Sequence, residues 1–116
     1  MSEPGLVIYR FSVGLFYANA ERFSEEILGL VSGPQPPRWF VLDAVAIDDV
    51  DYTGGQTLSE IADQLAERKI VLAIAEASPR LRVELDRFGV TARIGADHYF
   101  EGIEAAREAF RASHQA

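Results

Sequence analysis

An apolar run, FVLDAVAI, from Phe40 to Ile47, stands near the middle of the chain. A run with so few polar positions is typical of a strand covered on both faces, which places it at the centre of a sheet. An aspartate-rich turn, DDVDYTGG, follows, and then an amphipathic segment, QTLSEIADQL. The pattern predicts a central strand that leads directly into a helix, with the rest of the chain arranged to cover them.

The sequence predicts both the start and the buried face of this helix. Thr53 and Gln56 have the T-x-x-Q spacing of a capping box, so the helix is predicted to begin at Thr53. Four apolar residues then recur at the i, i+3, i+4 and i+7 positions that place a stripe against a sheet. These residues are Leu58, Ile61, Ala62 and Leu65.

Gly54 and Gly55 follow the predicted cap and carry no side chains. We expect them to leave the first turn of the helix bare, with backbone N–H groups accessible from outside. A strand that ends beside such a helix N-terminus is where open α/β sheets bind ligands and anions.

The N-terminal third predicts a hairpin and a helix. Leu6 to Phe11 reads as a first strand, and Leu15 to Tyr17 as a second, which must be antiparallel because a parallel crossover needs about a dozen residues. Asn19 stands where a helix cap is expected. The helix that follows is predicted to bury one face and to stop at Gly33. The residues of that face are Phe23, Ile27, Leu30 and Val31.

The C-terminal half alternates strands and helices. The segment from Gly33 to Arg38, GPQPPR, is a loop because its prolines cannot continue a helix. After the central strand and its helix, Lys69 to Ala75 reads as a wholly apolar strand. Ser78 and Pro79 have the order of an N-cap followed by a first helical residue. The helix they begin is predicted to point Leu81, Leu85 and Phe88 inward and to end at Gly89.

Two further elements complete the pattern. Thr91 to Ile94 fits a short edge strand, and a last helix, from about Glu101 to Ala112, is predicted to bury Ile103, Ala106 and Phe110. The order is a hairpin followed by βα units, which predicts an α/β fold with a mixed sheet, a parallel core and about four helices. We expect one domain over residues 1–116, with residues 1–5 and 113–116 frayed.

Composition narrows the classes of partner. The net charge is -7 with a pI near 4.7, and the eleven basic residues are scattered, which argues against a nucleic-acid partner. There are no cysteines, so neither a disulfide framework nor a thiolate metal site is expected. The N-terminus lacks the pattern of a signal peptide and no apolar run is long enough to span a bilayer, so the chain taken alone is predicted to be soluble.

The aspartates near the central strand are the first candidates for chemistry. Asp43, Asp48, Asp49 and Asp51 could hold magnesium or serve as acid and base. The simpler interpretation is a solvated turn whose carboxylates bind nearby N–H groups. A phosphoaspartate receiver is disfavoured because no acidic pair follows the first strand and no lysine follows Lys69.

Other polar and aromatic candidates have structural explanations. His98 and His114 lack a metal-ligand spacing and are predicted to be surface residues. Ser78 is better explained as a cap than as a nucleophile. Five aromatic residues near the N-terminus lack interleaved basic residues, so they indicate core and edge cover rather than a base-stacking surface. They are Tyr9, Phe11, Phe16, Tyr17 and Phe23. With no phosphate-binding glycine motif either, we predict no catalytic residues, no metal and no cofactor, and a protein that is not an enzyme.

Thr53 allows two interpretations. Capping alone explains it, as the T-x-x-Q spacing shows. A hydroxyl at a helix N-terminus ahead of two glycines is also a candidate acceptor of a phosphoryl group, because the helix end tolerates the charge. Thr53 is therefore a candidate phosphorylation switch.

Two segments carry a family resemblance. Asp51 to Gly54, DYTG, resembles the D-x-[ST]-G signature of STAS domains, named for sulfate transporters and anti-sigma factor antagonists. The segment LVIYR from Leu6, followed by LFYANAERF from Leu15 to Phe23, is similar more narrowly to the cytosolic C-terminal STAS domain of sulfate permease (SulP) family transporters. In that group a phrase close to L-[FY]-[FY]-A-N-A-x-x-F follows the first strand. The resemblance covers essentially the whole chain.

The resemblance implies a STAS-like fold and a non-enzymatic regulatory module of a sulfate or anion transporter. Its implied partners are the transmembrane domain of the parent transporter and cytosolic regulatory proteins, and its implied location is the cytoplasmic side of the membrane. Nucleotide or anion binding, known for some members, would fall to Asp51, Tyr52, Thr53, Gly54 and Gly55.

Two alternatives stay open. One is a free-standing anti-sigma factor antagonist switched by phosphorylation at Thr53, although Gly55 and Gln56 stand where antagonists usually have an apolar residue after the signature. The other is a small α/β enzyme that uses the aspartates. The phrase around Asn19 favours the transporter domain over the antagonist.

Overall fold

Four parallel strands in the order β1-β2-β3-β4 form the sheet of the computed structural model, which describes residues 3–115 and, for the last two of these, the backbone alone. The strands are β1 (Leu6–Arg10), β2 (Trp39–Asp43), β3 (Val71–Ala75) and β4 (Tyr99–Phe100). β2 pairs along its whole length with β1 on one side and β3 on the other. The apolar run therefore supplies a central strand, as predicted, although the strand ends at Asp43 rather than Ile47.

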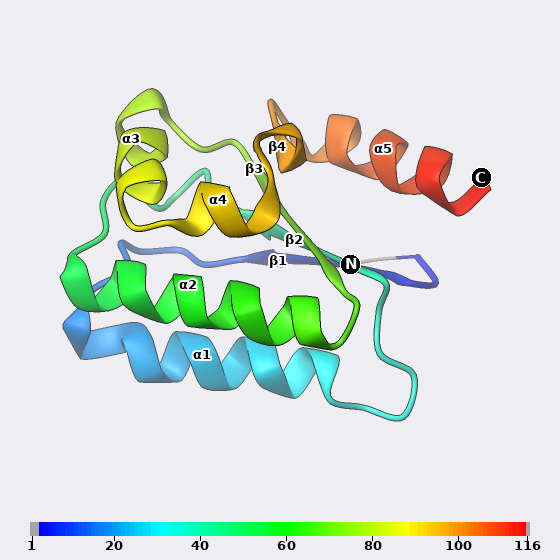
Figure 1. Cartoon of the computed structure of the whole chain (residues 1–116), viewed down its shortest axis with the longest axis horizontal. Coiled ribbons are helices and arrows are strands. Elements are labelled where there is room, and N and C mark those ends of the chain that lie inside the picture. The colour runs from blue at the N-terminus through cyan, green and yellow to red at the C-terminus, as the bar shows by residue number, and fades with distance from the viewer. Residues whose placement is uncertain (1–2, 116) are drawn as a thin grey trace.

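The helices divide between the two faces of the sheet (Figure 1). On one face lie α1 (Tyr17–Val31), α2 (Tyr52–Glu67), α3 (Pro79–Arg87) and α4 (Val90–Ile94), while α5 (Ile103–Gln115) covers the other. A short 3-10 turn, η1 (Ala96–His98), leads into β4. α1 and α2 lie side by side, and their N-terminal ends point to the same end of the molecule.

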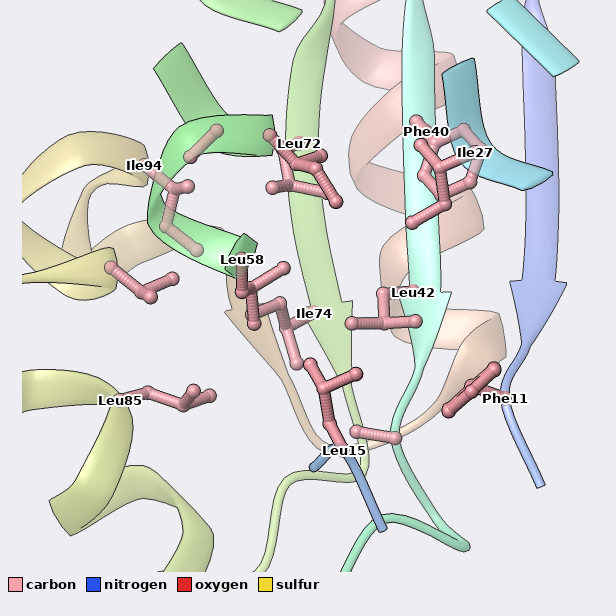
Figure 2. Close-up of a cluster of buried hydrophobic side chains, with 14 of the residues drawn as sticks. Phe11, Leu15, Ile27, Phe40, Leu42, Leu58, Leu72, Ile74, Leu85 and Ile94 are labelled. Atoms are coloured by element: carbon pink, nitrogen blue, oxygen red, sulfur yellow. The ribbon is translucent and has the colours of Figure 1, made fainter. Parts of the chain in front are cut away.

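Side-chain alternation along β2 explains the two apolar layers. Phe40 and Leu42 face the larger cluster, where Figure 2 shows them near Leu72 and Ile74 of β3. Trp39 and Val41 face the other way and pack in the smaller cluster under α5. Because successive side chains of a strand point to opposite faces, a strand buried on both sides needs an unbroken apolar sequence.

Several predictions from the pattern are confirmed. The α/β class is correct, and the α2 stripe of Leu58, Ile61, Ala62 and Leu65 is buried. Ser78 caps α3 by accepting a hydrogen bond from Leu81 N at 3.0 Å. In α5, Ala106 and Phe110 are buried, and Ile103 packs at the edge of the smaller cluster.

The N-terminal hairpin is the main error of the sequence-based prediction. The segment Leu15 to Tyr17 does not return antiparallel along β1: Leu15 forms a single parallel bridge with Val50, and α1 begins at Tyr17. After β1 the chain continues to Leu15, which pairs with the loop after β2 and not with β1 itself. The short connection between β1 and Leu15 therefore does not have to be a hairpin turn. The named strands are consequently all parallel, not mixed.

The predicted edge strand from Thr91 to Ile94 is also wrong, because these residues lie in α4. Gly89, at φ 84°, redirects the chain after α3. Val90 and Ile94, four residues apart, then both face the core. The edge strand is β4 instead, a two-residue element too short to be recognised from its pattern.

Smaller corrections concern α1. Asn19 is not the cap of α1 but its third residue, and Leu30 is 47% exposed. Fraying of residues 1–5 and 113–116 stays a prediction; of these residues, Glu3 accepts a hydrogen bond from Arg111 of α5 at 2.8 Å. Met1, Ser2 and Ala116 lie outside the described residues. No helix of residues 3–115 is long and apolar enough to cross a bilayer.

Candidate functional site

Asp51 joins the N-termini of the two long helices. It is the N-cap of α2, where its Oδ1 accepts from Gly54 N at 2.8 Å. Its Oδ2 accepts from the backbone N–H of Tyr17, the first residue of α1, at 2.9 Å. These N–H groups, Gly54 first and Tyr17 second, lower the pKa of the Asp51 carboxyl below its ordinary value.

Thr53 is therefore not the cap that its spacing with Gln56 predicted. α2 begins at Tyr52, and Thr53 occupies the second helical position, inside the helix. Aspartate ranks above threonine as an N-cap, and its charge also complements the positive helix end. Asp51 itself was the sequence signal for this boundary, and the T-x-x-Q match concealed it.

The two glycines of the turn are buried rather than bare. A Cβ atom on Gly54 would stand 2.2 Å from the carbonyl oxygen of Leu15, and one on Gly55 would stand 2.3 Å from the ring of Phe88. Glycine is required because α2 starts against neighbouring backbone and an aromatic ring. The expectation of accessible N–H groups at the glycines is wrong: Gly54 N donates to the Asp51 carboxylate and Gly55 N to the Asp51 carbonyl oxygen.

The loop before α1 is held against the loop before α2. Leu15 N donates to Asp49 O at 3.1 Å, and Asp51 N donates to Leu15 O at 3.2 Å. Asn19 then fixes the turn, since its Nδ2 donates to Gly14 O and its Oδ1 accepts from Phe16 N, both at 2.9 Å. Asn19, predicted to be a cap, thus acts from inside the helix on the residues that precede it.

Thr53 lies in a surface groove between α1 and α2, with a volume of about 600 Å³. From α2 the groove is lined by Thr53, Thr57 and Glu60, which recur at helical spacing along one face. From α1 it is lined on the facing side by residues that include Tyr17, Glu21, Ser24 and Glu25. Thr53 thus lines a surface groove that also carries glutamate side chains.

The candidate aspartates do not converge on one point. Asp43 pairs with Arg10 (Nε to Oδ2, 3.5 Å) and accepts from Val45 N at 3.1 Å. Asp49 pairs with Arg80 (Nη2 to Oδ2, 3.3 Å) and accepts from Val50 N. Asp48 is exposed. These contacts are those of the solvated-turn interpretation, and within residues 3–115 no group of three histidine, aspartate or glutamate side chains is placed to hold a metal ion.

The remaining candidates separate into core and surface. Phe11 and Phe23 belong to the larger cluster and Tyr9 packs against it, whereas Phe16 and Tyr17 are 38% and 78% exposed. The His98 ring lies edge-on to Trp39 and its Nδ1 contacts Ile94 O, so the ring is only partly at the surface. The side chain of His114 lies outside the described residues.

Comparison with known proteins identifies one family. A family model described as STAS domain matches residues 2–106. A probable sulfate transporter of Mycobacterium tuberculosis strain H37Rv is 38% identical over 93% of this chain, which corresponds to 20% of that protein. Probable sulfate transporter 3.5 of Arabidopsis thaliana is 29% identical over 92% of this chain and 17% of its own length. The chain thus spans about one fifth of the relatives it matches.

Solved structures agree on the fold. The SulP transporter STAS domain of Vibrio cholerae has a TM-score of 0.83 with 25% identity, covering 99% of this chain and 88% of that one. A sulfate transporter family protein of Wolinella succinogenes has a TM-score of 0.88 with 24% identity, covering 100% and 93%. A putative anti-sigma factor antagonist of Thermotoga maritima has a TM-score of 0.81 with 13% identity, covering 96% and 92%, and shares the fold alone.

Proposed function

This chain belongs to the STAS domain family, and we propose that it is the non-enzymatic regulatory domain of a sulfate or related anion transporter of the SulP family. The observation that carries the proposal is the 38% identity to one segment of a probable sulfate transporter, over nearly the whole of this chain. In the proposal the domain lies on the cytoplasmic side of the membrane. Its partners are the transmembrane domain of its parent transporter and cytosolic regulatory proteins.

Regulation through protein contacts suits the site better than catalysis does. Asp43 and Asp49 pair with arginines and accept from backbone N–H groups, and Asp51 serves to hold two helices together. A general acid or base needs a carboxylate that can reach a substrate proton. The enzyme alternative that uses the aspartates is therefore not favoured.

Thr53 is the residue we propose as the phosphorylation or switch site. Its position at the second residue of α2 keeps a phosphoryl group near the positive helix end, and its place in the groove puts that group on a surface a partner can contact. Because Thr53 does not cap the helix, its modification need not cost the stability of α2.

Nucleotide or anion binding at Asp51 to Gly55 is the less favoured part of the proposal. The Gly54 N–H, which would face an anion, already donates to Asp51. The N–H groups of Tyr52 and Thr53 are the donors left at this helix end. Any anion held there would also stand close to the Asp51 charge, so binding would be weak.

The second candidate function is a free-standing anti-sigma factor antagonist, favoured by the structural likeness to the Thermotoga maritima protein. It too would use Thr53 as its switch, but its partner would be a soluble kinase rather than a transporter.

The test is to read the genomic frame that contains this chain and then to measure transport. If membrane spans precede the domain, cells expressing the whole transporter should show sulfate uptake that changes when residues 3–115 are deleted, with the amount of protein in the membrane checked by immunoblot. Unchanged uptake would argue against regulation by the domain. A frame with no membrane spans, together with phosphorylation of Thr53 by a co-expressed anti-sigma kinase, would favour the antagonist.

A further inference from the structure

The groove between α1 and α2 has a floor of short side chains and a rim of carboxylates. Ala20, Ser24, Thr53 and Thr57 are buried or half-buried and line it, and their small size leaves the hollow open. The exposed carboxylates on its edges are Glu21, Glu25 and Glu60.

Within residues 3–115 these three carboxylates make no ion pair, as is also true of Asp48, Glu101 and Glu108 outside the groove; what distinguishes the three is that they line one hollow. Other carboxylates do pair with arginine, such as Asp63 with Arg93 and Asp86 with Arg82, both near 3 Å. No lysine or arginine lines the groove. Unpaired carboxylates grouped around a hollow repel one another and favour a cation brought by a partner.

Two arginines on or beside this helix pair are directed elsewhere. Arg22, next to Glu21 in sequence, pairs with Glu26 at 3.7 Å and lies over the ring of Phe11. Arg68, at the C-terminal end of α2, donates to Ser32 Oγ, just past the end of α1, at 3.0 Å. The chain therefore bridges the far end of the helix pair itself and leaves the groove near the N-terminal ends acidic.

Tyr17 marks the open end of the groove. Its backbone N–H is held by Asp51 while its side chain is 78% exposed, so an aromatic ring is available to a partner beside the carboxylates. Exposed tyrosines suit protein contacts, because the ring offers apolar area and a face for a cation at little cost in conformational entropy.

We propose that this groove binds a short basic segment of a partner protein, with lysine or arginine side chains on Glu21, Glu25 and Glu60 and an apolar or basic side chain on Tyr17. From Tyr17 to Glu25 the groove runs about 12 Å along α1, enough for roughly two turns of a partner helix. The inference rests on the proposed function, since it supplies the chemistry of the protein contact through which the regulatory domain acts.

The test starts from an unbiased probe. Random peptides of about twelve residues, displayed on phage, are selected on the immobilised chain at about 0.15 M salt, where long-range attraction is screened. Recovered peptides are synthesised with a fluorophore and their Kd is measured by anisotropy. We expect the selected sequences to be enriched in lysine and arginine.

Matched variants locate the binding. The triple change Glu21→Gln, Glu25→Gln and Glu60→Gln should weaken binding by about tenfold or more, which is about 1.4 kcal/mol. The control, Asp48→Asn, Glu101→Gln and Glu108→Gln, removes the same charge from exposed carboxylates outside the groove and should change Kd by less than roughly twofold. Thr57→Trp, which fills the floor without a change of charge, should also abolish binding.

Each other outcome contradicts the proposal. Peptides without basic enrichment, or equal losses in the two triple variants, would mean that only bulk negative charge attracts them. Self-association of the chain that the groove triple abolishes would mean that a second copy occupies the groove. Because the experiment uses this chain alone, it can fail while deletion of the domain still alters uptake, in which case the partner docks elsewhere.

Discussion

The carboxylate of Asp51 accepts a hydrogen bond from the backbone N–H of Tyr17, 34 residues earlier in the chain, at 2.9 Å. Its other oxygen caps α2 through Gly54 at 2.8 Å. One side chain thus satisfies an N–H group at the start of each of two neighbouring helices, which otherwise have no acceptor within their own helix. The aspartate of the D-x-[ST]-G segment is explained here by structure rather than by chemistry.

Asp51→Ala should therefore lower the melting temperature more than any other single aspartate change in the loop after β2. It removes both hydrogen bonds and leaves two helix N-termini without their acceptor. Asp48→Ala is the matched control, because Asp48 is exposed and in the same loop. Equal melting temperatures for the two variants, measured by circular dichroism, would contradict the bridging role.

The same contact predicts a pH dependence. The pKa of Asp51 is lowered from 3.8, chiefly by the Gly54 and Tyr17 N–H groups, so its contribution to stability is complete above pH 3.8. That contribution is lost as the pH falls through the lower pKa of the folded state. The difference in unfolding free energy between the wild type and Asp51→Asn should shrink below pH 3.8 in urea titrations. A difference that stays constant or grows on acidification would show that the charge of Asp51 is not what stabilises the fold.

Alanine substitutions at Ser78 and Thr53 should distinguish a residue that caps its helix from one that only has the sequence spacing of a cap. Ser78→Ala removes the acceptor for Leu81 N and should cost about 0.5–2 kcal/mol. Thr53→Ala should stay within about 0.5 kcal/mol of the wild type, because Asp51 holds the cap of α2. Chemical denaturation of both variants gives the comparison. A larger loss for Thr53→Ala would restore Thr53 as the cap.

Three glycine-to-alanine changes should differ in sign. Gly29→Ala, with nothing within 4 Å of the new Cβ, should stabilise α1 by about 0.5–1 kcal/mol. Gly54→Ala should destabilise by roughly 1–3 kcal/mol, because the new atom meets the backbone of Leu15, which cannot move aside cheaply. Gly55→Ala should also destabilise, through the ring of Phe88.

The obstacle at Gly55 is a side chain, so it can be removed. In the background of Phe88→Ala, Gly55→Ala should become nearly neutral, giving a coupling of about 0.5–3 kcal/mol in a double-mutant cycle. Additive losses in that cycle would mean that the ring is not the reason for glycine at this position.

Hydrogen exchange should follow the observed end of β2 rather than the end of the apolar run. The amides of Val41 and Leu42, fully buried and paired on both sides, should be among the slowest. Val45, in the same run, is 46% exposed and its N–H reaches only the Asp43 side chain, so it should exchange much faster. Equal protection at Val45 would extend the strand beyond Asp43.

Where one hydrophobic periodicity dominated a segment, the sequence was enough to predict the element and its buried face. The stripe from Leu58 to Leu65 and the alternation in β2 follow directly from burial against a sheet, and both are observed. The Ser78-Pro79 start was equally local, since a cap and its helix are a few residues apart.

The missing hairpin and the groove around Thr53 depend on contacts between segments that are distant in the sequence. Leu15 pairs with Val50, so the missing hairpin could not be read from one segment alone. The cap of α2 was a local signal that the T-x-x-Q spacing concealed, but the second bond of Asp51, to Tyr17, joins residues 34 positions apart. The groove containing Thr53 likewise exists only because α1 and α2 lie side by side. The sequence identified Thr53 as a candidate, whereas the groove around Thr53 depends on the packing of α1 against α2.

The groove around Thr53 predicts how a negative charge on this residue acts. Thr53→Glu adds a carboxylate to a groove that already carries Glu21 and Glu60 and lies near a positive helix end, so folding should be little affected. If the groove takes a basic segment, the added charge should tighten binding of the selected peptides by roughly two- to fivefold, the effect of one further exposed ion pair. Gln56→Glu is the control, since Gln56 is exposed on α2 and outside the groove, and it should change Kd by less than about twofold. Weaker binding by Thr53→Glu at unchanged melting temperature would mean that modification of Thr53 releases the partner rather than recruiting it. Equal effects of both variants would remove Thr53 from the binding surface.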